Sequence, residues 1–511
     1  MRASTVLMSL LAGTAAAASE PTVTVYNGGF AVVRDHLAVN LAGGIATVRY
    51  PGASSHVEPG TALIALPAGI EVLEHTYRND PVSASRLLRL FEGQVIDVEV
   101  LTGEGRRELR KARIVRAPAA LHQDAWSRFG NRYAQQQQSL YFGGNDGANE
   151  VLLEIDGQLR FGLPGTPLFP ALPADSDLRP TLEWQVRAAQ AVQGPAEVSY
   201  LCDGMRWEAA YTLIAAAGDE DHVDLNGVIS VENQSGTDFR GGRFKFVAGD
   251  VMKLDDEGND MRNELKTRMC FAGAMDAVGA VTSVSARAAG KEFSDYHLYT
   301  MPDALDLRDR ETKQLGFIDV HGVASRKRLV YDGLDLDWNN YRGWSPENIR
   351  TNREFATGMN PKVWIERLIE NRTTNQLGKP LPAGVVRCYL KDSDGKPEFI
   401  GENRIDHTPD GERMHLYSGN AFDLTGERVQ SDFACDGNQR TCDEGFRIVL
   451  RNHRQQPAEV TVVEHLYRGV NWAIRMPSTP FTKLDAHTIE FVVTVPANGE
   501  LPVGYQAHYS W

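Results

Sequence analysis

Runs of residues that alternate between apolar and polar, separated by glycine-rich turns, recur along most of this sequence. The β-branched run 22–26 is followed by Asn-Gly-Gly and by the apolar run 30–34. Near the C-terminus, every second residue of 489–495 and of 503–509 is apolar. A period of two is typical of strands that bury one face, and glycine clusters are typical of turns. The sequence therefore predicts a mainly β protein of several antiparallel β-sandwich domains, immunoglobulin-like or related, with a small inserted β-domain and few short helices.

Changes in this pattern divide the chain into segments. Most of the chain reads as strands, whereas 121–148 is polar and glutamine-rich and the predicted loops lack alternation. We predict a signal peptide at 1–18, an N-terminal β-meander at 19–59, a small inserted β-domain at 60–120, a connecting segment at 121–199, a central β-sandwich at 200–366 with long loops at 255–292 and 333–360, and a C-terminal β-sandwich at 367–511.

The N-terminal segment has the features of a secretory signal. Arg2 supplies a positive charge, an apolar stretch covers 5–12, and alanines at 15–18 precede Ser-Glu-Pro. The apolar stretch is shorter than the roughly 20 residues that cross a bilayer, whereas its charge and small residues follow the order of an export signal. We therefore expect an exported protein of the periplasm or cell surface, with no membrane span in the mature chain.

The balance of charge narrows the range of partners. The chain has 67 acidic and 53 basic residues, which gives a net charge of −14. Because affinity for nucleic acid comes largely from Lys and Arg, this balance argues against a nucleic-acid partner. The sequence contains no phosphate-binding loop, zinc-protease motif or nucleophile elbow, so we expect no cofactor and no bound metal.

Five cysteines are present, and two of them flank a short polar loop. Cys435 and Cys442 enclose Asp-Gly-Asn-Gln-Arg-Thr, which in an oxidising compartment predicts a local disulfide. The remaining three, Cys202, Cys270 and Cys388, leave an odd thiol. Cys202 and Cys388 lie in strand-like segments, where we expect small buried hydrophobic residues. A bridge from Cys202 to Cys388 or to Cys270 stays open.

One pattern occurs three times. A strand-like run ends in asparagine and a polar turn follows, at Asn233, Asn371 and Asn452. Asparagine at such a position can bond to nearby backbone and shape the turn. Because the spacing is irregular and β-sandwiches in general use such turns, the pattern alone does not predict a sequence repeat.

Several segments share their pattern with a known family. They are 25–34, 200–211, 231–236, 246–251, 378–387, 401–409 and 420–423, of which 378–387 is the most specific. On these segments, which span nearly the whole mature chain, the sequence resembles the bacterial domain-of-unknown-function family 4139, related to the mucoidy-inhibitor-A-like proteins. The resemblance implies a secreted or envelope protein rich in β structure and supplies no catalytic residues. Some relatives have a central coiled coil, for which this chain has no sustained heptads.

Candidate catalytic residues are few. If a strand pair brought His407, His415 and Asp423 together, they would form an acid–base group or a metal site. The favoured interpretation is structural, with a turn at 406–411 and the histidines on a solvated strand face. We therefore assign no catalytic and no metal residues.

Aromatic residues suggest a binding surface. Trp338, Tyr341, Trp344 and Trp364 are close to Asn and Arg, a combination that suits sugar rings, although rings that cover the end of a sandwich core are the favoured interpretation.

The function we expect is that of an exported envelope or surface protein, a non-enzymatic binding or structural module for polysaccharide or another envelope protein. One alternative is a hydrolase of envelope polymers that uses 406–423. The other is an outer-membrane β-barrel, suggested by the aromatic alternation of 503–511.

Overall fold

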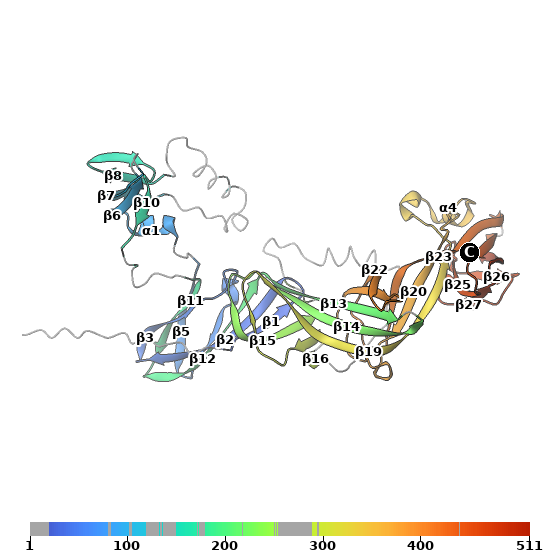
Figure 1. The fold of residues 1–511 in the computed structure, drawn as a ribbon, viewed down its shortest axis with the longest axis horizontal. Helices are drawn as coiled ribbons and strands as arrows, with labels where there is room; N and C mark the ends of the chain where they lie inside the picture. Colours follow the sequence, from blue (N-terminus) through green and yellow to red (C-terminus); the bar gives the residue numbers. More distant parts are fainter. Residues whose placement is uncertain are drawn as a thin grey trace, which may run out of the picture. The chain divides into compact units, whose positions relative to one another are not determined.

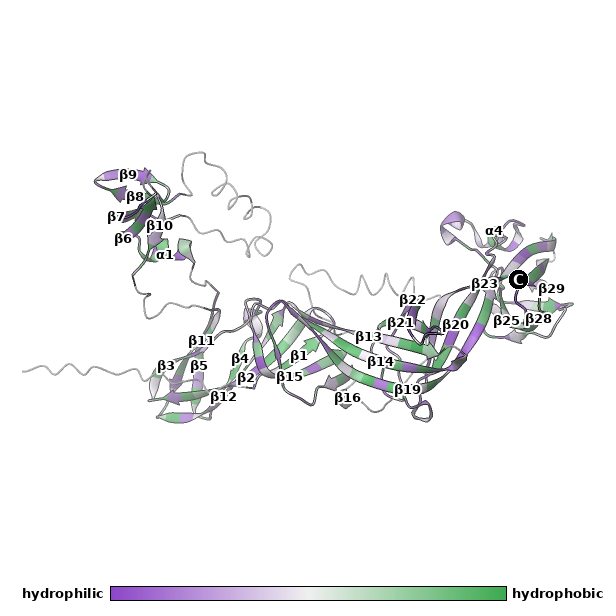
Figure 2. Ribbon diagram, in the orientation of Figure 1, coloured by the Kyte–Doolittle hydropathy of each residue, from purple (hydrophilic) through white to green (hydrophobic). Residues whose placement is uncertain are grey.

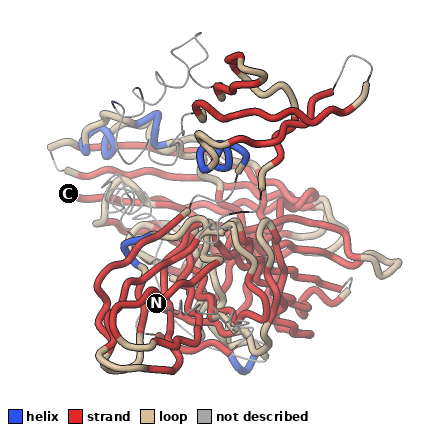
Figure 3. The backbone as a smooth tube through the Cα atoms, turned by 90° about the vertical axis from the view of Figure 1, so that its left-hand side faces the viewer, coloured by secondary structure: helices blue, strands red, loops and turns tan. Residues whose placement is uncertain are grey.

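The computed structural model describes residues 20–79, 83–101, 105–118, 132, 135, 150–170, 172, 179–216, 218–249, 251, 253, 289–293, 296–438 and 440–511. Strands make up most of these residues, and the α-helices with described bounds, α1 (Ala84–Leu90) and α4 (Pro346–Thr351), are short (Figure 1, Figure 3). The predicted mainly β class is confirmed, with several separate sheets. The predicted signal peptide and most of the predicted loop 255–292 lie outside the described residues.

The chain forms two compact units. The first comprises the described residues within Met1–Trp207, Glu232–Asp276 and Met301–Lys313, and the second those within Glu208–Val231, Ala277–Thr300 and Gln314–Trp511. Each unit is therefore assembled from segments that are distant in sequence.

The first unit contains three sheets. One has the order β15 (Phe239–Ala248), β1 (Thr22–Tyr26), β2 (Phe30–Leu41), β12 (Val192–Asp203) and β4 (Leu63–Ala65), and β18 (Leu305–Leu307) also pairs with β15. A second has the order β3 (Gly44–Pro51), β11 (Thr181–Ala188) and β5 (Ile70–Arg78). The third has the order β10 (Thr166–Leu168), β6 (Val95–Leu101), β7 (Arg107–Arg116), β8 (Leu152–Ile155) and β9 (Gln158–Phe161), and it has a hydrophobic core of its own.

The second unit is organised around one large sheet. Its order is β22 (Pro397–Ile405), β21 (Gly384–Lys391), β13 (Met205–Ala216), β14 (Asp219–Asn233), β19 (Glu311–Asp332), β20 (Lys362–Glu370), β23 (Arg413–Asp436), β24 (Thr441–Asn452), β29 (Gly499–Ser510) and β26 (Trp472–Arg475). Connected to this sheet are β25 (Ala458–His465), β28 (Thr488–Val495) and β27 (Thr482–Lys483). Separately from it, β16 (Ala289–Phe293) pairs with β17 (Tyr296–Thr300).

Alternating burial explains why these segments form strands. In β13 the residues from Met205 to Ala215 are buried at every second position, as the period of two in the sequence predicts. In Figure 2 hydrophobic and hydrophilic stretches alternate along many strands. The predicted apolar faces of 489–495 and 503–509 both belong to the core of the C-terminal part of the second unit.

The three strand-end asparagines are buried and make equivalent hydrogen bonds. Asn233, Asn371 and Asn452 are at most 1 % exposed. Each Oδ1 accepts a hydrogen bond from a backbone N–H farther along the chain, that of Ser235 at 3.0 Å, Gly378 at 2.8 Å and Arg454 at 2.9 Å, respectively. Each Nδ2 donates to a carbonyl at or just beyond the end of a later strand, that of Leu307, Thr408 and Val495, respectively.

The strands around these asparagines share one connectivity. The strand that follows each asparagine (β15, β21, β25) pairs in parallel with an earlier strand (β1, β13, β19). The same strand pairs in antiparallel fashion with a later one (β18, β22, β28). The earlier strand is in each case next to the strand that follows it in sequence, β2, β14 or β20. The fold therefore contains three copies of one strand arrangement, each with a buried asparagine at the same position.

We expect Asn452→Ala to lower the free energy of unfolding by about 3 kcal/mol, because it leaves four backbone groups, one buried and three partly buried, without this hydrogen-bond partner. These groups are the N–H of Arg454 and the carbonyls of Gln456, Val495 and Pro496. Denaturant unfolding measures the loss. Asn340→Ala, at an exposed position, is the control and should change stability by less than about 0.5 kcal/mol. Equal losses in both variants would contradict a bracing role for Asn452.

Candidate functional site

The three polar residues that were candidates for a hydrolase site each face a different partner. His407 Nδ1 accepts the N–H of Ala383 at 3.1 Å, and the carboxylate of Asp423 faces Arg454 at 4.0 Å. His415 is opposite Leu368 of β20, whereas Asp423 follows Asn420, the residue opposite Trp364. Leu368 and Trp364 are four residues apart on β20, which is about 13 Å in an extended strand. Because His415 and Asp423 lie opposite these two positions or beyond them, they are too far apart to share a reacting group.

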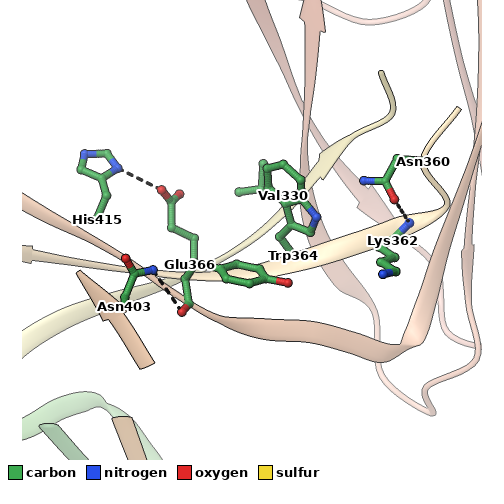
Figure 4. Close-up of a pocket in the computed structure, with 8 residues that line it drawn as sticks. Val330, Asn360, Lys362, Trp364, Glu366, Asn403 and His415 are labelled. Carbon is green, nitrogen blue, oxygen red and sulfur yellow. Dashed lines mark hydrogen bonds and ion pairs between the residues drawn. The ribbon is translucent and has the colours of Figure 1, made fainter. Parts of the chain in front are cut away.

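His415 nevertheless lines a pocket on the second unit. The pocket has a volume of about 610 Å³ and is built mainly on β20 and β23 (Figure 4). Its lining residues combine two aromatic rings with amide, charged and imidazole groups. They are Val330, Asn360, Lys362, Trp364, Glu366, Asn403, His415 and Tyr417.

The pairing of β20 with β23 explains why the pocket opens here. Lys362, Trp364 and Glu366 occupy alternate positions of β20, so they share one face of the strand. The register between β20 and β23 shifts on both sides of Trp364. Such bulges interrupt the ladder and redirect side chains. In the bulge between Trp364 and Glu366, opposite residues 417–420 of β23, Gly419 has φ +122°, a conformation that favours glycine.

Two aromatic rings form the apolar part of the pocket. Trp364 and Tyr417 contact each other edge to face, with ring centroids 6.0 Å apart and an interplanar angle of 75°. Trp364 is half-buried and Tyr417 is 40 % exposed, so both rings keep surface available to a ligand. The Tyr417 hydroxyl donates to Asn420 Oδ1 at 2.9 Å, which fixes the direction of the ring.

Polar groups lie on both sides of Trp364. Figure 4 shows His415 and Glu366 on one side and Asn360 and Lys362 on the other. His415 Nδ1 is 2.9 Å from Glu366 Oε1, and Arg328 Nη1 is 3.8 Å from Glu366 Oε2. Asn360 Oδ1 accepts the backbone N–H of Lys362 at 3.2 Å, which holds that end of β20 in place.

The aromatic residues predicted to form a surface divide into two groups. Trp338, Tyr341 and Trp344 pack around the fully buried Phe355, with centroid distances of 6.2, 5.1 and 6.3 Å. These three cover a core, as the favoured interpretation states. Trp364 instead lines the pocket with Tyr417, which the sequence analysis did not single out. The signal available was the alternation His-Leu-Tyr at 415–417, which places the two polar rings on one strand face.

The predicted disulfide is present. Cys435 and Cys442 occupy opposed positions of the β23–β24 hairpin and are bonded to each other. Cys202 and Cys388 are free, buried thiols, so the suggested bridge between them is absent. Cys270, the other suggested partner, lies outside the described residues.

We expect both buried thiols to resist alkylation in the native protein. Burial raises the pKa of Cys202 to about 12 and that of Cys388 to about 11, so little thiolate forms near neutral pH. In a Cys270→Ser variant, labelling should be at least about a hundredfold slower than for an exposed thiol, and both thiols should label fully in denaturant. Rapid labelling of either residue in the folded protein would contradict its burial.

Within the part of the chain that the structure describes, no group of three His, Cys, Asp or Glu side chains is arranged to hold a metal ion. No helix among the described residues is long and apolar enough to cross a membrane.

Comparisons with known proteins leave the family unassigned. No protein-family model matches the chain, and no curated protein matches it. The resemblance to domain-of-unknown-function family 4139 therefore stays a prediction.

Proposed function

We propose that this chain is an exported, non-enzymatic binding protein of the cell envelope or surface, and that its pocket on β20 and β23 binds polysaccharide. The observation that carries this proposal is the open pair Trp364 and Tyr417 between polar groups in one pocket. The apolar face of a sugar ring stacks on an aromatic ring, and its hydroxyls bond to neighbouring amide and carboxylate groups. Ligand pockets in general combine such an apolar lining with a few placed polar groups.

The carboxylate content of the pocket favours binding over hydrolysis. Most glycosidases place two carboxyl groups on either side of the bond that they cleave. Among the residues that line this pocket, Glu366 is the one carboxylate, and both of its oxygens face cations or imidazole. A hydrolase would have to work with the pair Glu366 and His415, which is the observation that keeps this alternative open.

The cellular location is part of the proposal. The disulfide between Cys435 and Cys442 fits an oxidising compartment such as the periplasm or the cell exterior. The signal-like sequence of 1–18 supports export, and membership of family 4139 would agree with an envelope protein. Another envelope protein is the alternative partner.

Co-sedimentation with isolated cell-wall, outer-membrane and exopolysaccharide fractions tests this function, with the supernatant assayed for released fragments. We expect retention on a polysaccharide fraction without release. Fragment release that Glu366→Gln abolishes would replace the proposal with a hydrolase. Absence of both retention and release would overturn polysaccharide binding and favour a protein partner.

A further inference from the structure

We infer that the sugar held in this pocket is anionic and that its acidic group lies at the Lys362 end. This inference rests on the proposed function and adds the class of polysaccharide, one that contains uronic acid. It depends on how the charges of the pocket are compensated.

The carboxylate of the pocket, Glu366, has partners within the protein. Glu366 faces His415 through one oxygen and Arg328 through the other, at 2.9 and 3.8 Å. Arg328 in turn bonds to Glu490 at 3.1 Å, and the side chains of Arg328, Glu366 and Glu490 are all at most 23 % exposed. Arg328, Glu366 and Glu490 thus form one largely buried ion-pair network. The remaining lone pairs of Glu366 can accept hydrogen bonds from hydroxyl groups of a ligand.

The positive charge of the pocket is not compensated. Lys362 is exposed, and its ammonium has no hydrogen-bond or ion-pair acceptor within the described part of the chain. Its backbone N–H bonds to Asn360 Oδ1, so the root of the side chain is fixed while the ammonium stays available. An ammonium in this position attracts an anionic group, and a charge-assisted hydrogen bond to a carboxylate is stronger than one to a neutral oxygen.

The spacing along β20 gives the ligand a direction. Lys362 and Glu366 are four residues apart, about 13 Å in an extended strand, with Trp364 between them. One sugar ring stacked on Trp364 would thus have a neighbour on each side. The ring toward Lys362 would carry the carboxylate, and the ring toward Glu366 and His415 would present hydroxyls. The pocket therefore suits an acidic sugar chain in one orientation.

Titration calorimetry with matched sugars tests this inference. The probes are trigalacturonate and a hyaluronan tetrasaccharide, each compared with its neutral methyl ester, and neutral chitotriose and maltotriose. The wild-type protein should bind an acidic probe about tenfold more tightly than its ester. Lys362→Met should reduce the affinity for the acid to that for the ester, whereas Lys362→Arg should keep most of the difference.

Lys396→Met is the matched control, because Lys396 is exposed on the hairpin before β22 and does not line the pocket. It should leave the preference for the acid unchanged. Equal binding of acid and ester, binding of neutral sugars alone, or an equal effect of Lys396→Met would overturn the anionic inference and leave polysaccharide binding standing. If none of the acidic, esterified and neutral sugars binds, the proposed function fails as well.

Discussion

Replacing Arg428 with alanine is expected to lower the free energy of unfolding of the second unit by about 3–5 kcal/mol. Arg428 Nε donates to both carboxylate oxygens of Glu464, at 3.0 and 3.1 Å. The side chains of the two residues are 2 % and 0 % exposed. Removing the guanidinium would leave the Glu464 charge buried without its partner, which is the costly way to break such a pair.

The surroundings of Arg428 explain why this pair is stable in the core. Arg428 Nη1 donates to the carbonyl of Ala356 at 2.9 Å, and its guanidinium lies 3.7 Å from the centre of the Phe446 ring. Burial alone would lower the pKa of Arg428, but Glu464 and Tyr505 raise it above the ordinary value, so the cation persists. The Tyr505 hydroxyl donates to Glu464 as well. The cation and carboxylate are therefore satisfied by several groups at once.

Two further variants make this prediction specific. Arg451→Ala breaks an exposed pair with Glu427, whose side chains are 40 % and 43 % exposed, and should cost at most about 1 kcal/mol. The double variant Arg428→Met with Glu464→Leu should recover most of the loss, because neither charge of this pair is then left buried without its partner. Denaturant unfolding measures all three. A loss for Arg428→Ala no larger than for Arg451→Ala would contradict the account of this core.

Trp364→Ala is expected to weaken polysaccharide binding at least thirtyfold, a change of about 2 kcal/mol, which is typical of a central aromatic contact. The substitution removes the larger ring of the pocket and the edge-to-face contact that orients Tyr417. Because Trp364 is half-buried at the surface, the fold should persist. Trp364→Phe keeps a smaller ring and should keep part of the affinity. Affinity electrophoresis in polysaccharide gels measures the change.

Phe422→Ala is the matched control for Trp364→Ala. Phe422 is on β23, the strand that pairs with β20, within the register shift between Asn420 and Thr425. It is 96 % exposed and does not line the pocket. It should leave binding unchanged. An equal loss for Phe422→Ala would move the binding surface away from the pocket, and undiminished binding by a folded Trp364→Ala variant would exclude the pocket from recognition.

Features that depend on nearby residues could be predicted from the sequence. The buried faces of 489–495 and 503–509 follow from a period of two within a single strand. The disulfide follows from two cysteines across one short loop. The partners of the buried tyrosines could not be predicted in this way. Tyr505 bonds to Glu464 and Tyr509 to Glu444, and these carboxylates belong to β25 and β24.

The pocket and the repeated arrangement depend on long-range register, which a single sequence does not reveal. Trp364 and Tyr417 meet only because β20 pairs with β23 and because bulges interrupt that pairing. A shift of one residue would turn Tyr417 to the other face of the sheet. Likewise, the equivalence of Asn233, Asn371 and Asn452 lies in their distant carbonyl partners rather than in their spacing along the chain.

Fluorine NMR of fluorotryptophan-labelled protein tests polysaccharide binding at this pocket most directly. The chain has eight tryptophans, and the signal that is missing from a Trp364→Phe variant identifies Trp364. On addition of polysaccharide we expect this signal to shift, while the buried Trp184 and Trp207 keep theirs. A Trp364 signal that stays unchanged under saturating polysaccharide would contradict the assignment of the pocket as the binding site.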